Sequence, residues 1–86
     1  MPYIIKDSRE DLDNIISKFP EIPTLSDGEL TYIIYKLLLD HIKYNKSYST
    51  LSSCMGILEC VKSEFYRRVI SPYEDKKIEE NGDVIW

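Results

Sequence analysis

The sequence predicts an all-α fold: a short N-terminal helix followed by two long antiparallel helices, the last of them kinked or broken at Pro72. Three observations carry this prediction. Apolar residues recur every three or four positions along most of the chain, which is the spacing of a helix with one buried face. A serine and a glutamate three residues apart open two of these stretches. Prolines and an Asn-Gly pair mark where the stretches stop.

A short helix is expected first, ending at a proline-containing loop over residues 20–25. Asp7 or Ser8 can cap it, because their side-chain oxygens accept hydrogen bonds from the free amides of a first turn. The acidic residues that follow suit the positive end of the helix dipole. The apolar stripe of this helix consists of Leu12, Ile15, Ile16 and Phe19.

The second helix is expected to open with a capping box. In it, the Ser26 hydroxyl accepts a hydrogen bond from a first-turn amide and the Glu29 carboxylate accepts one from the Ser26 amide. The body of this helix runs from Leu30 to about Tyr44 and is apolar over a wide arc. One face of it holds Leu30, Ile33, Ile34, Leu37, Leu38 and His41.

The third helix is expected to start near Ser49 and to carry a seam like that of a coiled coil. The seam consists of Leu51, Cys54, Leu58, Val61, Phe65 and Val69. Gly56 lies within this helix at a cost of about 1 kcal/mol relative to alanine. Either another backbone approaches closely at Gly56, or the glycine has no structural role.

Pro72 fits the first position of a new helix, with Ser71 as its cap and Glu74 as the third-position partner. Since a proline also disfavours helical backbone in the residue before it, the third helix should break or kink here and restart. Asn81-Gly82 either ends this last helix, with the glycine in a left-handed conformation, or forms a hairpin turn. The agreement between the proline and the capping box favours the helix.

The composition is that of one globular domain spanning residues 1–86, with 43% hydrophobic and 30% charged side chains. The net charge of −4 argues against general binding to nucleic acid or to a membrane surface. The charge is uneven, because residues 30–72 hold six basic and three acidic side chains between two acidic ends. The middle of the chain is therefore either a local anion-attracting surface or a pair of helices with solvated lysines.

Cys54 and Cys60 are the only cysteines, and six residues place them roughly 240° apart around a helix. They cannot form a disulfide with each other, and their apolar neighbours indicate reduced thiols that face the core. The chain shows neither a basic-then-apolar leader nor an apolar run long enough to span a membrane. We therefore expect a cytoplasmic protein.

The two long helices show apolar side chains over arcs much wider than the stripe of about 100° that a surface helix buries. A monomer of three or four helices cannot cover both arcs, unless its short helices wrap unusually tightly. We expect symmetric self-association into an oligomeric helical bundle, which buries the second face of each helix.

Catalytic and metal-binding patterns are absent from the sequence. His41 is the only histidine and lies on an apolar helix face, which favours a semi-buried structural role. No serine or cysteine has a recognisable base partner, and there is no glycine-rich phosphate loop. Two cysteines and one histidine lack the paired spacing of a metal site. We expect no enzymatic activity, no cofactor and no metal.

Candidate ligand-binding residues gather towards the end of the third helix and just past the expected kink. They are Lys62, Tyr66, Arg67, Arg68 and Tyr73. Arginine can bind phosphate or carboxylate with two parallel hydrogen bonds, and a tyrosine ring can stack on a base. The alternative is that the arginines pair with Glu64, Glu74 or Asp75 and stabilise the kink.

The same region carries a resemblance to a known family. Two blocks carry it, and no common sequence motif contains either of them. They are Glu64-Phe65-Tyr66-Arg67-Arg68 and Pro72-Tyr73-Glu74-Asp75-Lys76-Lys77-Ile78-Glu79-Glu80-Asn81-Gly82-Asp83-Val84. Through them the chain resembles a family of short uncharacterised proteins encoded by bacteriophage and bacterial genomes, over about residues 26–86. The resemblance implies a phage-type context, which would place the protein in the host cytoplasm, and it implies no established activity.

Two hypotheses about function follow. The more concrete one is a non-enzymatic, phage-type anti-defence sponge, a homo-oligomer that sequesters an anionic, cyclic nucleotide signal of host defence at a subunit interface. The alternative is a helical protein–protein interaction adaptor that docks a host or phage protein through its apolar and tyrosine-rich surfaces. Direct nucleic-acid binding is disfavoured by the acidic ends of the chain.

Overall fold

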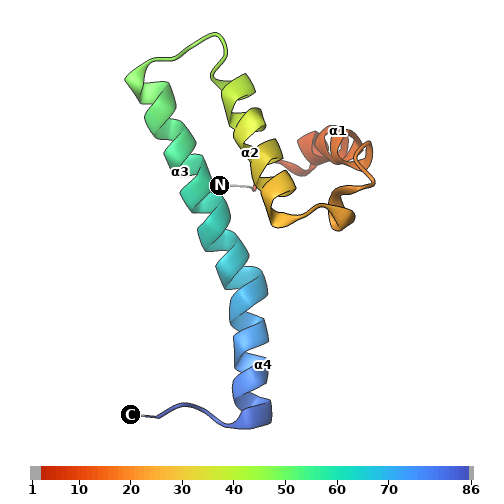
Figure 1. The fold of residues 1–86 in the computed structure, drawn as a ribbon, viewed down its shortest axis with the longest axis vertical. Helices are drawn as coiled ribbons and strands as arrows, with labels where there is room; N and C mark the ends of the chain where they lie inside the picture. The colour runs from red at the N-terminus through yellow and green to blue at the C-terminus, as the bar shows by residue number, and fades with distance from the viewer. Residues whose placement is uncertain (1–2, 86) are drawn as a thin grey trace. The chain divides into compact units, whose positions relative to one another are not determined.

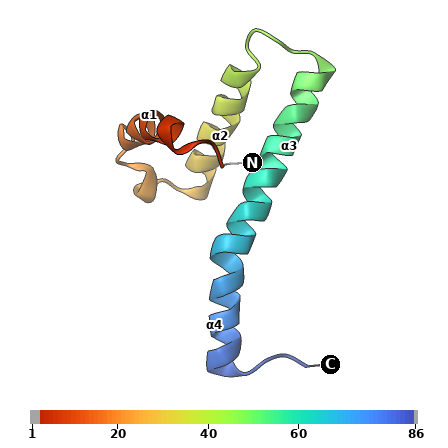
Figure 2. The same cartoon turned by 180° about the vertical axis from the view of Figure 1, so that it is seen from behind.

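The computed structural model describes residues 3–85, and within that range it is helical with no strand (Figure 1). In chain order the elements are α1 (Lys6–Ser17), a 3-10 turn (Ile22–Thr24), α2 (Asp27–His41), α3 (Tyr48–Phe65), a π-helical turn (Tyr66–Ile70) and α4 (Ser71–Asn81). Figure 2 shows the same helices from behind. The all-α prediction is confirmed, and the hairpin alternative at Asn81-Gly82 is wrong.

The chain divides into two compact units, and the boundary falls within α3. The N-terminal unit, Tyr3–Cys54, holds α1, the 3-10 turn, α2 and the first turns of α3. The C-terminal unit includes residues 55–85 and holds the rest of α3, the π-helical turn and α4. Each unit is described by itself below.

Helix α1 begins at Lys6, two residues earlier than the nearer of the two predicted caps, Asp7, allows. The residue before it, Ile5, is extended and makes no side-chain cap hydrogen bond, so the prediction of a cap at Asp7 or Ser8 is wrong. In place of a side-chain cap, the Ile5 carbonyl accepts a hydrogen bond from the Ser8 amide over 3.1 Å. Arg9 Nε donates to the Ile4 carbonyl over 2.9 Å. Asp7 lies in the first turn, where its charge suits the helix dipole.

Helix α2 opens with the predicted capping box. The Glu29 amide donates to Ser26 Oγ over 3.2 Å, and the Ser26 amide donates to Glu29 Oε1 over 2.9 Å. The hydrogen bond from the Ser26 backbone amide, and after it one from the Ser26 side chain to the carboxylate, lower the pKa of Glu29. The expected loop before this helix is also present and contains the 3-10 turn.

Helix α2 ends at His41, three residues before the predicted limit at Tyr44. The side chain of Tyr44 is 92% exposed, so no apolar contact favours another helical turn there. A polar turn follows, in which Asn45 Oδ1 accepts a hydrogen bond from the Ser47 amide over 3.1 Å. Ser47 Oγ in turn accepts from the Thr50 amide over 3.3 Å, which starts α3 within one residue of the predicted position.

In the C-terminal unit the helical backbone bends but continues past Pro72. The predicted kink is therefore confirmed, and the predicted break with Ser71 as a new cap is wrong. Ser71 is helical, with φ −58° and ψ −47°, and α4 begins without a side-chain cap hydrogen bond. The Ser71 amide donates to the Tyr66 carbonyl, five residues back, as in a π-helix. A proline in a regular α-helix clashes with the carbonyl four residues before it. The wider π-helical turn bends the helix and accommodates the ring.

Helix α4 stops where the Asn-Gly pair predicted. Asn81 is its last residue, and Gly82 has a φ of 86°, a conformation that residues with a Cβ rarely adopt. The Gly82 amide donates to the Ile78 carbonyl over 2.8 Å, which satisfies one of the free carbonyls at the helix end.

Very few side chains are buried. Among the described residues Cys54 alone is buried, with 8% of its surface exposed, while Cys60 is half-buried; both thiols are free, as predicted. Most large apolar side chains of all four helices keep more than a third of their surface in solvent. Within the described range, no helix has the length and apolar character needed to cross a membrane.

Candidate functional site

A hollow of about 380 Å³ lies beside the end of α3 and the π-helical turn, and we call it the Arg67 hollow. Its lining residues are Glu59, Lys62, Ser63, Tyr66, Arg67 and Ser71. Three of the five predicted ligand-binding residues therefore share one concave surface: Lys62, Tyr66 and Arg67. Lys62 and Tyr66 meet because residues four positions apart lie on one side of a helix, and Arg67 follows Tyr66 directly.

Carboxylates already balance the two cations of the Arg67 hollow. Arg67 Nη2 lies 2.6 Å from Glu64 Oε1, in the pairing that the sequence offered as the alternative to a ligand site. Lys62 Nζ lies 3.9 Å from Glu59 Oε2, and both of these side chains are largely exposed, so this pair contributes little stability. An anion that entered the hollow would have to compete with both carboxylates.

Tyr66 makes a side-chain hydrogen bond that spans the proline of the C-terminal unit. Its hydroxyl donates to Glu74 Oε1 over 2.5 Å, across eight residues and past the proline. This hydrogen bond raises the pKa of Tyr66, with further contributions from the negative charge of Glu74 and from desolvation. Glu74, which was predicted to complete a capping box with Ser71, instead accepts the hydrogen bond of Tyr66. The proton of the Tyr66 hydroxyl is therefore already engaged within the protein.

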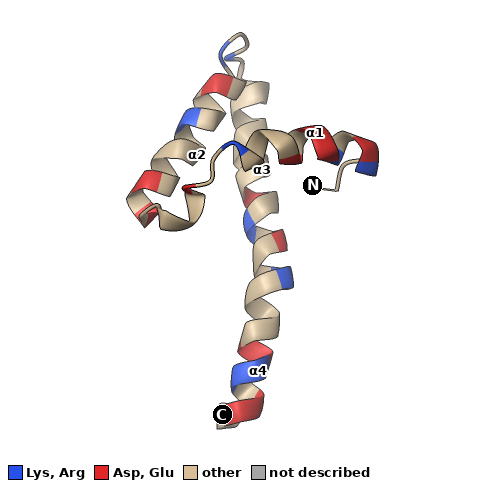
Figure 3. Ribbon diagram, turned by 90° about the vertical axis from the view of Figure 1, so that its right-hand side faces the viewer, with Lys and Arg blue, Asp and Glu red and all other residues tan. Residues whose placement is uncertain are grey.

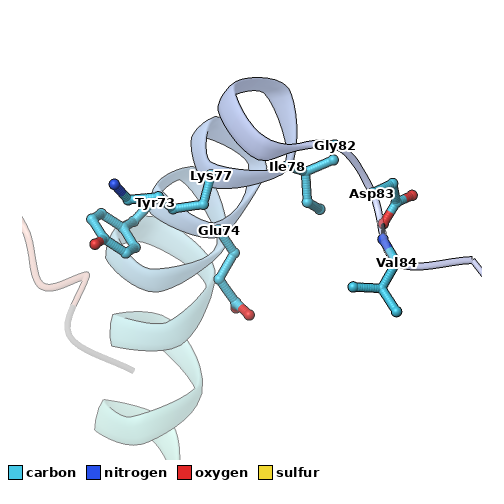
Figure 4. Close-up of a pocket in the computed structure, with 7 residues that line it drawn as sticks. All are labelled: Tyr73, Glu74, Lys77, Ile78, Gly82, Asp83 and Val84. Atoms are coloured by element: carbon cyan, nitrogen blue, oxygen red, sulfur yellow. Dashed lines mark hydrogen bonds between the residues drawn. The ribbon is translucent and has the colours of Figure 1, made fainter.

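Tyr73 lines a different hollow, of about 370 Å³, which we call the Tyr73 hollow (Figure 4). Its lining residues are Tyr73, Glu74, Lys77, Ile78, Gly82, Asp83 and Val84. Figure 4 shows Lys77 lying beside the Tyr73 ring, and its Nζ is 5.5 Å from the ring centroid, a cation–π contact. The same Nζ lies 3.3 Å from Glu80 Oε2. This lysine was not among the predicted site residues.

Arg68 lines neither the Arg67 hollow nor the Tyr73 hollow. Within the described part of the chain its side chain forms no ion pair or hydrogen bond. The five predicted residues thus divide into three that share the Arg67 hollow, one in the Tyr73 hollow and one apart from both.

The N-terminal unit contains a third concavity, of about 330 Å³, which we call the apolar pocket. It is formed by α1, the segment after it and α2, and its lining residues are Ile15, Ile16, Phe19, Glu21, Ile22, Leu25, Leu30, Ile33 and Leu37. The sequence predicted the two stripes that form it, as faces for packing rather than as a site. Because the burial of a stripe depends on what covers it, the periodicity alone could not reveal that Phe19 and Leu37 are 57% and 64% exposed.

Among the described residues, none of these concavities holds a metal-binding cluster. Across residues 3–85, no three His, Cys, Asp or Glu side chains come together in a way that could hold a metal ion. His41 is the last residue of α2 and is exposed, so the prediction that it is semi-buried is wrong.

A family described as "Domain of unknown function (DUF6899)" matches residues 1–84. The chain belongs to this family. The DUF6899 match includes the C-terminal block on which the predicted resemblance rests, and it extends over the N-terminal unit as well. No curated protein and no solved structure matches the chain. Since the DUF6899 description carries no activity, function has to be argued from the surfaces of the molecule.

Proposed function

We propose that this DUF6899 protein is a non-enzymatic protein–protein interaction adaptor. We further propose that it is phage-encoded, acts in the host cytoplasm and works as a homo-oligomer. The observation that carries the adaptor role is the exposure of apolar side chains on all four helices while Cys54 alone is buried among the described residues. Contiguous exposed apolar surface is characteristic of protein interaction sites.

The energetics support this proposal. Fixing the backbone of one residue costs about 1–2 kcal/mol of conformational entropy. Full burial of an apolar side chain contributes about 1.5–3 kcal/mol. With one buried side chain in its described part, the chain gains little from burial to set against the cost of ordering its helices. Covering the exposed apolar faces with further copies or with a partner would add to that gain.

The seam of α3 and the π-helical turn is the surface best suited to a further copy. Leu58, Val61, Phe65 and Val69 continue the heptad-like spacing and are 36–56% exposed. Such a seam packs against another helix with the same spacing, and a second copy supplies one.

The test of the adaptor role is in-cell cross-linking of the full-length chain, followed by mass spectrometry of the captured proteins. Phe65→Glu places a charge on the seam, and Arg67→Ala removes the guanidinium of the Arg67 hollow two positions away. We expect Phe65→Glu to lose the partner that the natural chain captures and Arg67→Ala to retain it. Identical partner sets for both variants would contradict the proposal.

A second candidate, the anti-defence nucleotide sponge, is favoured by one observation. Lys62, Tyr66 and Arg67 line the same hollow of about 380 Å³, so two cations and an aromatic ring are within reach of one ligand. A cyclic nucleotide would have to displace Glu59 and Glu64 from Lys62 and Arg67 before it could bind there. This cost is why the adaptor is the better supported role.

Calorimetry with cyclic dinucleotides, cyclic trinucleotides and ADP-ribose derivatives tests the sponge. Binding that Arg67→Ala abolishes, together with release of material absorbing near 260 nm on heat denaturation, would support it. If none of these compounds binds at tens of micromolar, the sponge role is contradicted and the adaptor role is the one that stands.

A further inference from the structure

We infer that the apolar pocket of the N-terminal unit is a docking site for a basic amphipathic helix of a partner protein. This inference rests on the proposed adaptor role and adds the chemistry of the partner. Two independent properties of the pocket carry it: the apolar character of its lining and the acidic character of the segment around it.

The lining suits apolar side chains and little else. Eight of its nine residues are apolar, and Glu21 is the exception. Buried polar groups need hydrogen-bond partners, so a nucleotide or sugar would leave its own polar atoms unsatisfied there. An amphipathic helix instead inserts apolar side chains spaced three or four residues apart and keeps its polar face in water. A pocket of about 330 Å³ has room for one or two such side chains.

The pocket is also open to a partner. Ile15 and Ile16 on α1, and Phe19 just after it, are 53–58% exposed, and Leu37 on α2 is 64% exposed. These side chains would lose their contact with water when a helix docks, and that burial supplies the affinity.

The charge around the pocket selects the partner. Residues 1–29 hold seven acidic and three basic side chains. Figure 3 shows the acidic residues along α1, and none of them takes part in a salt bridge within the described residues. Glu21 belongs to the lining of the pocket, and α1, which contributes Ile15 and Ile16 to that lining, carries more acidic than basic residues. This excess of negative charge attracts a helix whose polar face carries lysine or arginine, and it repels one that carries glutamate.

Fluorescence anisotropy of the full-length protein with two labelled synthetic peptides tests the inference. The peptides share one leucine face, and their polar faces carry lysine in one and glutamate in the other. We expect the lysine peptide to bind, and the glutamate peptide to bind about tenfold more weakly at low salt. The difference should shrink at high salt, because the charges lie at the surface.

Three variants locate the binding. Glu21→Lys reverses the charge of an exposed residue in the lining and should weaken the binding of the lysine peptide several-fold. Phe19→Ser removes an apolar side chain from the lining and should weaken the binding of both peptides. Tyr35→Ser, on α2 but outside the pocket and 59% exposed, is the matched control and should bind like the natural chain.

Equal binding of the two peptides, or binding that neither Glu21→Lys nor Phe19→Ser changes, would overturn the inference. Absence of peptide binding together with a lower particle mass for Phe19→Ser would also overturn it, because a second copy would then occupy the pocket. The adaptor role would survive each of these outcomes, since its own test depends on Phe65→Glu.

Discussion

The hydrogen bond from Tyr66 to Glu74 is the residue-level feature that most clearly links the two sides of Pro72. It spans the π-helical turn and holds an aromatic ring against a carboxylate that a regular cap would have used. It also explains why Tyr66 reaches the Arg67 hollow with its hydroxyl already donating. A single side-chain pair thus joins the π-helical turn, the first turn of α4 and the candidate ligand site.

We predict that Tyr66 is the last of the seven tyrosines to ionise. Glu74 raises the pKa of Tyr66, first through the hydrogen bond and then through its charge. Because the folded pKa lies above the unfolded value of about 10, the bond stabilises the fold fully below that pH. The stabilisation is lost as the pH rises through the folded pKa. Alkaline titration of tyrosine absorbance measures this.

Two variants check the assignment. Tyr66→Phe should remove the latest-titrating step, and Glu74→Gln should move that step to lower pH while the tyrosine count stays the same. A late step that persists in Tyr66→Phe would show that another tyrosine is responsible.

Two glycines of the C-terminal unit should respond to alanine with opposite signs. A Cβ at Gly56 meets nothing within 4 Å, so Gly56→Ala should stabilise α3 by about 1 kcal/mol through helix propensity. Gly82→Ala should destabilise α4, because a φ of 86° strains any residue with a Cβ. Urea unfolding followed by far-ultraviolet circular dichroism compares them. Loss of stability in Gly56→Ala would mean that another chain approaches this glycine.

At the scale of elements, the capping box is the best-defined helix start in the molecule. Ser26→Ala removes the hydroxyl that accepts from the Glu29 amide, and it should lower the free energy of unfolding by about 1 kcal/mol. The lowered pKa of Glu29 adds a pH dependence: its stabilisation is present above the unfolded carboxyl pKa and is lost as the pH falls through the folded pKa. Urea unfolding of Ser26→Ala at neutral pH and in acid measures both effects. An unchanged free energy at neutral pH would contradict the role of the cap.

The π-helical turn is an element whose cause can be tested directly. Pro72→Ala restores a backbone N–H and removes the clash with the preceding turn. We expect the turn to convert to regular α-helix and the amides from Tyr66 to Glu74 to exchange more slowly with solvent. Hydrogen exchange followed by nuclear magnetic resonance measures this. A turn that persists in Pro72→Ala but disappears in Tyr66→Phe would place its cause in the Tyr66–Glu74 hydrogen bond.

At the scale of the whole molecule, the exposed apolar surface leads us to expect self-association. We predict that the purified protein scatters light as a particle of at least twice 10.1 kDa at micromolar concentration. Val61→Glu and Phe65→Glu place charges on the exposed seam and should reduce that mass. Tyr44→Glu, in the turn after α2 and 92% exposed, is the control and should not. A particle of 10.1 kDa for the natural chain would contradict self-association.

Much of this architecture could be predicted from the sequence, because helix starts, stops and faces depend on neighbours a few residues away. The box at Ser26 and Glu29, the stop at Gly82 and the loop around Pro23 all follow from local hydrogen bonding and backbone preference. The predicted cap at Asp7 or Ser8 failed because α1 begins at Lys6, where the Ile5 carbonyl accepts from the Ser8 amide. The predicted cap at Ser71 failed because the π-helical turn carries the helix through that residue.

The candidate site was predicted only in part. Helical spacing brings Lys62, Tyr66 and Arg67 onto one side of a helix, and the structure places all three in the Arg67 hollow. The spacing did not indicate that Tyr73 lines another hollow, because the local backbone around the proline separates the two.

The sequence by itself determined the helices and their ends, since periodicity and capping act over one or two turns. Only the tertiary structure decided that the backbone continues past Pro72, that Glu74 holds Tyr66, and that the apolar stripes of α1 and α2 enclose an open pocket. These features depend on which side chains meet across turns and on how much of each helix face is left exposed. The order of residues along the chain does not specify either of these.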